Sequence, residues 1–471
     1  MKLKIEYRWP LFLSFVFFGF LIGALRQLDP DFGWHVQAGR YISEYGLPRH
    51  DVFTYTARNF RWINHEWLHD VLVAQTYRLG GYNLLAVLFA ALWTVSIRLA
   101  AGNKHSLVIP AIAVIALLPQ AGVRPAVWSV IGVLVMARLI ASYVSRPQIG
   151  TVLLIGALLA LWANLHGSFI LGLLMLIAHT AVRKDRSALM VLAVAAVATL
   201  LNPYGPGLYE EVWRTAFDHE LHWHIREWWP LLLPFPVVAY SALFFSCFWL
   251  AEPRKVHAAV LLPGAAFLLA LSGARHAPIF VALSLQPFES YRQTVRQKMD
   301  IPSLSIPQKR VRRALQAMIA IVIVAAAINA VIPWRYGWSV YPWRSVAYLR
   351  THPCPGNLFN DYNIGGFLVW QLPGQPVYID GRMPSWPAGN TTYFSRYLAV
   401  RRSAAERNRQ FTEYNIRCVL TKQAGAVEVE LERRLDFISD KIYSKDIAAP
   451  LQADGWHVVM RESGYVLLMK E

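Results

Sequence analysis

Two carboxylates and a histidine near the N-terminus have a spacing that could do acid–base chemistry. Asp29 precedes a proline, as helix N-caps often do, and Gly and Pro follow residue 45, so the sequence predicts a helix over 29–45. Asp31 then lies in the first turn, where the helix dipole favours an ionised carboxylate, and His35 lies one turn later on the same face. Such a carboxylate could take a proton from an acceptor hydroxyl, although a favourable helix-start residue explains Asp31 equally well.

A second polar run contains His65, Glu66 and His69, which form a literal H-E-x-x-H. With Asn64 as the N-cap of a helix, this spacing places two histidines on one face to bind zinc, with Glu66 as the general base of a metalloprotease. The extended motif with a third histidine is absent, and only a distant carboxylate such as Asp380 could complete the metal site. A membrane zinc protease is therefore an alternative reading of this run.

The composition indicates what kind of elements position these residues. Of the 471 residues, 55% are hydrophobic and 16% are charged, against about 25% charged in average soluble domains. This balance excludes a soluble globular enzyme, a disordered chain and a fibrous repeat. The net charge of +17 is that expected of cytoplasmic anchor charges on a membrane protein.

Apolar runs predict about eleven membrane-spanning helices, the first of them a retained span rather than a cleaved signal peptide. The predicted spans are Trp9–Leu25, Tyr82–Ile97, Leu107–Leu118, Ala126–Tyr143, Thr151–Ala163, Phe169–Val182, Ala188–Leu201, Leu231–Leu250, Ala258–Leu271, Pro278–Phe288 and Leu315–Val331. Lysine and arginine concentrate in alternate loops, which places the N-terminus in the cytoplasm and residues after about 334 outside.

Nearly all concentrated polar and aromatic clusters fall in the predicted outer loops, and this pattern indicates one composite site at the outer membrane surface. Ordinary loop ends and interfacial aromatic residues are the alternative explanation for any single one of them. The outer clusters, in chain order, are Asp29–His35, Asn64–Asp70, Val123–Pro125, Ala163–Ser168, Asn202–Gly205, Arg226–Pro230 and Ala274–Pro278.

Several of these motifs together resemble a group of bacterial polytopic membrane proteins related to the GT-C glycosyltransferase superfamily. They are D-P-D-F-G-W-H, G-L-P-R-H-D-V-F-T-Y-T, W-I-N-H-E-W-L, W-A-N-L-H-G-S-F, L-N-P-Y-G, I-R-E-W, R-H-A-P and N-D-Y-N-I-G-G-F-L-V-W-Q-L-P. The resemblance implies a GT-C-like, α-helical polytopic domain over 1–333 with a large first outer loop at 26–81. A C-terminal extracytoplasmic α/β domain over 334–471 follows, in a multi-pass protein of the bacterial inner membrane and cell envelope.

The resemblance also implies an activity, the transfer of a sugar from a polyprenyl-phosphate-linked donor to an extracytoplasmic lipid or glycan acceptor. A carboxylate in the first outer loop would be catalytic, and Asp31 matches it best, with Asp29 second and His35 beside them. The chain has Asp-x-Asp there in place of the adjacent acidic pair or Glu-x-Asp that many GT-C enzymes show. A lipid-linked glycan polymerase or ligase, or a transporter, is the alternative within the same setting.

The expected donor has a phosphate and sugar hydroxyls, and the outer loops hold side chains suited to both. Arginine makes bidentate contacts to phosphate, which favours Arg124 and Arg275 with His276. The other candidate substrate-binding residues are Asn164, His166, Asn202, Tyr204, Glu227, His65, Glu66, Asp380 and Arg382. A divalent metal could bridge carboxylate and phosphate, but the few outer acids do not require one. No other cofactor and no nucleic-acid partner is expected.

The C-terminal segment predicts a small α/β domain. Strands are expected at Asn357–Phe359, Phe367–Gln371, Val377–Ile379 and Arg417–Thr421, a helical stretch at Thr391–Tyr414, and a terminal hairpin that turns at Ser463 and Gly464. Asp380, Gly381 and Arg382 form either a substrate-binding turn or an internal salt bridge. Cys354 and Cys418 could pair, and the sequence leaves this pairing open.

Overall fold

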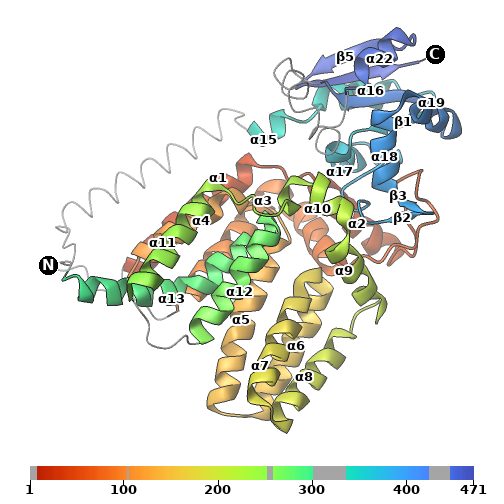
Figure 1. Ribbon diagram of the computed structural model, residues 1–471. Helices are drawn as coiled ribbons and strands as arrows, with labels where there is room; N and C mark the ends of the chain where they lie inside the picture. Colours follow the sequence, from red (N-terminus) through yellow and green to blue (C-terminus); the bar gives the residue numbers. More distant parts are fainter. Residues whose placement is uncertain (1–7, 103–105, 252–257, 301–335, 424–445, 471) are drawn as a thin grey trace. The chain divides into compact units, whose positions relative to one another are not determined.

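Figure 1 shows a computed structural model of the chain, which describes residues 8–102, 106–251, 258–300, 336–423 and 446–470. Contacts divide the chain into two compact units. Unit 1 contains Met1–Gln27, Gly80–Gly205 and Glu227–Arg335, and unit 2 contains Leu28–Leu79, Pro206–Arg226 and Tyr336–Glu471. The expected first outer loop therefore belongs with the C-terminal segment, whereas the sequence boundary at residue 333 assigns it to the membrane domain.

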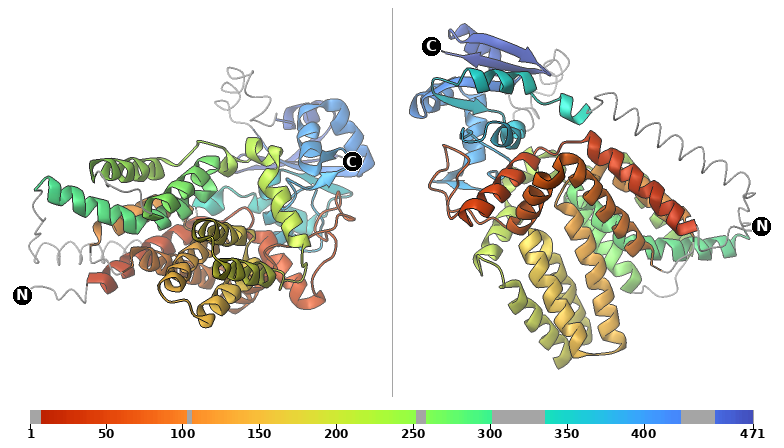
Figure 2. Two further views of the ribbon diagram at one scale, coloured as in Figure 1. Left: turned by 60° about the horizontal axis from the view of Figure 1, so that its bottom comes forward. Right: turned by 180° about the vertical axis from the view of Figure 1, so that it is seen from behind.

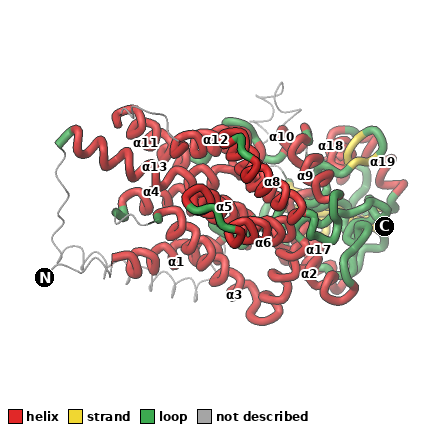
Figure 3. The backbone as a smooth tube through the Cα atoms, turned by 90° about the horizontal axis from the view of Figure 1, so that it is seen from below, coloured by secondary structure: helices red, strands yellow, loops and turns green. Residues whose placement is uncertain are grey.

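All regular secondary structure in the described part of unit 1 is helical, and the tube view draws these helices in red (Figure 3). Its α-helices are α1 (Arg8–Arg26), the later part of α3 (Trp67–Ala101), α4 (Val108–Leu117), α5 (Ala126–Ser145), α6 (Ile149–Leu165), α7 (Ile170–Arg183), α8 (Arg186–Thr199), α11 (Phe235–Ala251), α12 (Ala258–Ser272) and α13 (Ala277–Lys298). Short 3-10 turns η2 (Leu118–Gln120), η3 (Gly167–Phe169) and η5 (Ala274–His276) join them, and η4 (Arg226–Trp228) lies at the boundary.

Helix α13 is the centre of one half of unit 1, where it contacts α4, α5, α11 and α12. Tyr240 and Phe244 of α11 meet Phe280 and Phe288 of α13 in edge-on ring contacts, and all four side chains are buried. Helices α5 to α8 form the other half and run side by side in both views (Figures 1 and 2). This aromatic and aliphatic burial is the core of unit 1.

Large apolar side chains cover the outside of these helices. Leu153, Leu161, Leu174 and Leu268 are each more than half exposed. A helix that is apolar all round is typical of a membrane span, because lipid rather than protein covers its outer face. Within the described ranges, α1, α3 and α5 can cross a membrane by length and composition, and six further helices are apolar but shorter. Ten of the expected spans are helices here, the eleventh (Leu315–Val331) lies outside the described residues, and the count stays a prediction.

Unit 2 begins with helix α2 (Phe32–Tyr45) and the first turns of α3, which kinks at Gly80 and Gly81 where the units divide. Among the described residues of unit 2, the other helices are α9 (Gly207–Phe217), α10 (His219–His224), α15 (Tyr336–Ser339), α16 (Trp343–Thr351), η6 (Tyr362–Ile364), α17 (Gly365–Gln371), α18 (Tyr393–Arg402), α19 (Ala404–Glu413) and α22 (Ala448–Ala453). The strands are β1 (Asn357–Asn360), β2 (Pro387–Ala388), β3 (Thr391–Thr392), β4 (Ile416–Lys422), β5 (His457–Glu462) and β6 (Tyr465–Met469).

The main sheet of unit 2 has the strand order β1-β4-β6-β5. Strand β1 is parallel to β4, and the other neighbours are antiparallel. The expected hairpin is present as β5 and β6. Ser463 and Gly464 both have positive φ at its turn, as a two-residue type I′ turn requires. The expected α/β character of this segment is thus confirmed within the described residues.

Two local predictions for the C-terminal segment are wrong, and a third is confirmed except for one break in the helix. Phe367–Gln371 is helical as α17, because a short buried apolar run fits a helix and a strand equally well. Val377–Ile379 belongs to none of the described strands; Val377 forms an isolated bridge with Thr54, and Tyr378 lies in a bend. The helical stretch expected at 391–414 is two helices, because Ser403 ends α18 and accepts a cap hydrogen bond from the Glu406 amide of α19.

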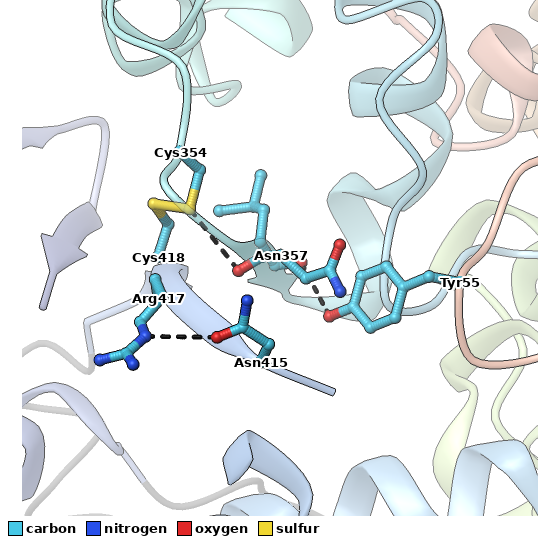
Figure 4. Close-up of a disulfide and its surroundings, with 7 residues drawn as sticks. Tyr55, Cys354, Asn357, Asn415, Arg417 and Cys418 are labelled. Carbon is cyan, nitrogen blue, oxygen red and sulfur yellow. Dashed lines mark hydrogen bonds between the residues drawn. A yellow bond between two sulfur atoms is a disulfide. The ribbon is translucent and has the colours of Figure 1, made fainter. Parts of the chain in front are cut away.

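Cys354 and Cys418 form a disulfide between the loop before β1 and strand β4 (Figure 4). The same region is tied to the first loop, because the Tyr55 hydroxyl donates to the Leu358 carbonyl at 3.1 Å. The pairing of Cys354 with Cys418, which the sequence leaves open, is present in the structure.

Candidate functional site

Asp31 lies at the N-terminus of α2, held by its immediate neighbours. The helix begins at Phe32, later than expected, because Asp29 instead closes a turn: its Oδ1 accepts from the Asp31 amide at 2.9 Å. Asp31 Oδ1 accepts from Trp34 Nε1 at 3.0 Å, and the Asp31 carbonyl accepts from the His35 amide. The Asp31 side chain is only partly buried, so the carboxylate combines a fixed position with access to solvent.

His35 forms the buried centre of this part of unit 2. Its Nδ1 lies 2.6 Å from Asp70 Oδ1, and its Nε2 lies 3.7 Å from Glu66 Oε2. Burial alone lowers the pKa of His35, but the charge and hydrogen bond of Asp70, with smaller contributions from Glu66 and Asp31, raise it to about 9. His35 is therefore an imidazolium at neutral pH, paired with carboxylates, which makes it unsuited to act as a general base.

The H-E-x-x-H run does not have the geometry of a zinc-protease motif. Helix α3 begins at Trp67, so His65 and Glu66 lie in the preceding turn, and the expectation that Asn64 starts the helix is wrong. The Asn64 amide group instead donates to Asp70 at 2.7 Å, and its Oδ1 accepts from the Glu66 amide. Across the described ranges, no group of three or more His, Cys, Asp and Glu side chains could hold a metal ion. No step of the reaction is assigned to a metal ion.

Asp380 and Arg382 form a buried ion-pair cluster that includes Asp51 of the first loop. Arg382 Nη2 lies 2.6 Å from Asp380 Oδ2 and 2.8 Å from Asp51 Oδ1, and all three side chains are almost fully buried. Burial lowers the pKa of the guanidinium, but the two carboxylates outweigh this and raise the pKa above its ordinary value. Aromatic rings of Trp62, Phe53 and Trp386 surround the guanidinium. This cluster has no open face for a sugar, and its geometry is that of an internal salt bridge.

Unit 1 brings together three predicted site residues from distant parts of the chain. Glu227 Oε2 lies 3.6 Å from Arg124 Nη1, and its Oε1 lies 3.9 Å from Arg275 Nη1. All three side chains are about one third to one half exposed. The Arg275 guanidinium stacks over Trp228, whose ring also contacts His276 edge-on. Two loosely paired, accessible guanidinium groups can accept an anion in exchange for the carboxylate.

The predicted sugar-binding amides and histidine of unit 1 make mainly local hydrogen bonds. Asn202 forms a turn, with its side chain bonded to the Thr199 and Gly205 carbonyls and to the Tyr204 amide. Asn164 donates to the Ala160 and Leu201 carbonyls. His166 Nδ1 lies 2.6 Å from the Ser168 hydroxyl and accepts from the Ser168 amide. These contacts order the ends of α6 and α8.

Sequence reasoning missed three carboxylates that organise unit 2. Asp70 pairs with His35, and Asp51 pairs with Arg382, so the cationic partner of each lies far away in the sequence. Asp361 is a third, since it binds Arg401 and accepts from the Thr421 hydroxyl and the Lys422 amide. The available signal was an acid placed inside an apolar or aromatic run, which is rarely left unpaired.

Comparison with known proteins finds relatives by structure. Neither a protein-family model nor a curated protein sequence matches the chain. The archaeal oligosaccharyltransferase AglB from Archaeoglobus fulgidus, in complex with an inhibitory peptide and a dolichol-phosphate, matches with a TM-score of 0.58 at 12% identity, over 97% of this chain and 73% of AglB. ArnT from Cupriavidus metallidurans, bound to undecaprenyl phosphate, matches with a TM-score of 0.51 at 13% identity, over 98% of this chain and 97% of ArnT.

The chain has the GT-C fold. The apo oligosaccharyltransferase of A. fulgidus gives the same result, with a TM-score of 0.57 at 10% identity over 89% of this chain and 70% of that protein. AglB and ArnT are both GT-C polytopic membrane glycosyltransferases. The resemblance found in the sequence is therefore confirmed for the fold, and a membrane location of the chain agrees with this fold. At such identities the likeness establishes the GT-C fold and leaves the reaction to the side chains of this chain.

Proposed function

We propose that this GT-C protein is an integral membrane glycosyltransferase, which moves a sugar from a polyprenyl-phosphate-linked donor to an extracytoplasmic acceptor. The observation that carries the proposal is the pair of accessible guanidinium groups, Arg124 and Arg275, gathered around Glu227 from three separate loops. The solved neighbours support the lipid class, since one is bound to a dolichol-phosphate and another to undecaprenyl phosphate.

The proposed reaction uses two groups of this chain. Arg124 and Arg275 bind the lipid phosphate and stabilise the charge that grows on it as the sugar leaves. Asp31 accepts the proton of the acceptor hydroxyl. At the same time the hydroxyl oxygen of the acceptor bonds to the anomeric carbon of the sugar, and the bond between that carbon and the phosphate oxygen breaks. The products are the glycosylated acceptor and the free polyprenyl phosphate.

The disulfide supports an extracytoplasmic place for the C-terminal segment and hence for the acceptor. Disulfides form and persist in oxidising compartments and are rare in the cytosol. Cys354 and Cys418, paired in unit 2, both lie after residue 334, in the segment that the loop charges place outside. A donor head group at the outer membrane surface would be on the same side.

The proposal is tested by binding of undecaprenyl phosphate to the purified protein, measured by lipid-resolving mass spectrometry. We expect the wild type to retain the lipid, and the Arg124→Ala/Arg275→Ala variant to lose it by at least about tenfold. Arg183→Ala is the matched control, because Arg183 is an exposed arginine of unit 1 paired only with Asp185. Equal retention by the double variant and the control, both folded, would contradict the proposed donor site.

A further inference from the structure

The C-terminal segment reaches the Asp31 carboxylate through the turn at Gly381. A Cβ built on Gly381 would stand 1.8 Å from Asp31 Oδ1 and 2.8 Å from its Cγ. Real Cβ atoms do not approach other atoms so closely, so a side chain at this position would force the Asp31 carboxylate or the turn to shift. Both residues belong to unit 2, and 350 positions of sequence separate them.

The turn that carries Gly381 is held rigidly on both sides. Asp380 Oδ1 accepts from the Arg382 backbone amide at 3.0 Å and from Arg382 Nε at 2.9 Å, which closes the turn on itself. The Arg382–Asp51 contact ties the turn to the first loop, and a hydrogen bond from the Thr56 hydroxyl to the Tyr378 carbonyl adds a second tie. A buried, bidentate arginine pair of this kind leaves the turn little freedom.

The same oxygen of the carboxylate, Asp31 Oδ1, is also bound by Trp34. Its indole N–H donates to Asp31 Oδ1, and its ring lies 3.7 Å from the His35 ring, which the Asp70 pair fixes in turn. Trp34 is almost fully buried, so its ring has a defined place. The Asp31 carboxylate is thus contacted by an indole from its own helix and by a glycine turn from the C-terminal segment.

We infer that the Asp380–Gly381–Arg382 turn and Trp34 are positioning elements for Asp31, and that the C-terminal segment thereby takes part in the transfer reaction. The inference rests on the proposed function. It assigns the D-G-R motif a role in aiming the catalytic carboxylate, beyond the substrate-binding turn or internal salt bridge between which the sequence leaves the choice open. A displacement of about 1 Å at a reacting group can cost on the order of 100-fold in rate.

The contact itself is tested without any assay of activity. The variant Asp31→Cys/Gly381→Cys, in the full chain, places two thiols within disulfide reach. After alkylation in denaturant, intact mass is expected to show one modified thiol, that of Cys247, whereas each single variant shows two. Three modified thiols in the double variant would overturn the contact and the inference.

The positioning role is tested by kinetics with a polyprenyl-phosphate-linked sugar. Gly381→Ala, which forces the carboxylate aside, is expected to lower kcat at least about tenfold, while KM and undecaprenyl phosphate binding stay at the wild-type values. Trp34→Phe, which keeps an aromatic ring but removes the indole N–H donor, is also expected to lower kcat. Gly150→Ala is the matched control, because nothing lies within 4 Å of its added Cβ.

The outcomes separate the inference from the proposed function. Unchanged kcat in both Gly381→Ala and Trp34→Phe would overturn the positioning role while the proposed function stands. A fall in kcat matched by an equal loss of lipid binding or of folded protein would overturn it too, because a structural defect would then explain the result. If the wild type transfers no sugar, the proposed function fails and the catalytic role with it, while the cross-link still decides the contact.

Discussion

At the scale of single residues, His35 is the group whose charge the fold of unit 2 depends on. Its pKa is raised from an ordinary 6.5 to about 9, so the folded state binds a proton that the unfolded chain releases earlier. The stabilisation from its pair with Asp70 is therefore fully present below about pH 6.5 and is lost as the pH rises through about 9.

We expect the melting temperature of the purified protein to fall between about pH 7 and pH 10, and His35→Gln to flatten this dependence. His35→Ala leaves Asp70 buried without its cation and should cost roughly 3–5 kcal/mol at neutral pH. Thermal unfolding across pH for the three proteins provides the measurement. A wild-type profile identical in slope to that of His35→Gln would contradict the pairing.

The sequence offers candidate site residues where a short pattern or a loop position points to them. Helix spacing suggests Asp31 and His35, and positions at loop ends suggest Arg124 and Arg275, and their roles stay predictions. Asp51 and Asp70 are not suggested in this way, because their partners Arg382 and His35 lie 331 and 35 positions away and no short pattern links them. Burial decides such pairs, and burial follows from the tertiary fold.

At the scale of elements, the packing of α2 on α17 joins the first loop to the C-terminal segment. A Cβ on Gly33 would stand 2.0 Å from the Gly366 carbonyl oxygen, and one on Gly366 would stand 2.4 Å from the Pro30 carbonyl oxygen. The helices therefore meet backbone to backbone, with Phe32 and Trp370 in edge-on contact beside them. Side chains at either glycine would separate them.

We expect Gly33→Ala to destabilise unit 2 by roughly 1–3 kcal/mol, the usual cost of forcing extra atoms into a packed contact. The measurement is thermal unfolding in detergent, with Gly150→Ala as the control, since its position is open. A Gly33→Ala protein as stable as the control would show that the α2–α17 contact does not stabilise the unit.

Elements with strong patterns were predicted well from the sequence, and ambiguous ones were not. The β5–β6 hairpin and ten span helices follow from alternation, turn residues and long apolar runs. Phe367–Gln371 has β-type residues yet forms part of α17, in which Gly366 packs closely against the Pro30 carbonyl. Tertiary contact overrode local preference there.

At the scale of the whole molecule, the loop charges and the disulfide predict opposite sides of the membrane for two parts of the chain. Arg183 lies in a predicted cytoplasmic loop, and Arg409 lies on α19 of unit 2, with both side chains well exposed. In a Cys247→Ser background, a membrane-impermeant maleimide should label Arg409→Cys in intact cells and Arg183→Cys only after permeabilisation. The reverse pattern would overturn the topology.

The most direct test of the central proposal is release of free polyprenyl phosphate from a polyprenyl-phosphate-linked sugar by the protein in liposomes that contain a bacterial envelope lipid extract as acceptor. The account predicts release by the wild type and a fall of at least about 100-fold in Asp31→Asn, which keeps the size of the side chain but cannot take a proton. Asp31→Asn should still bind undecaprenyl phosphate. Equal release of polyprenyl phosphate by the two proteins would contradict the role of Asp31 as the base. If a folded wild type binds the lipid but releases no polyprenyl phosphate, the transferase proposal itself is contradicted.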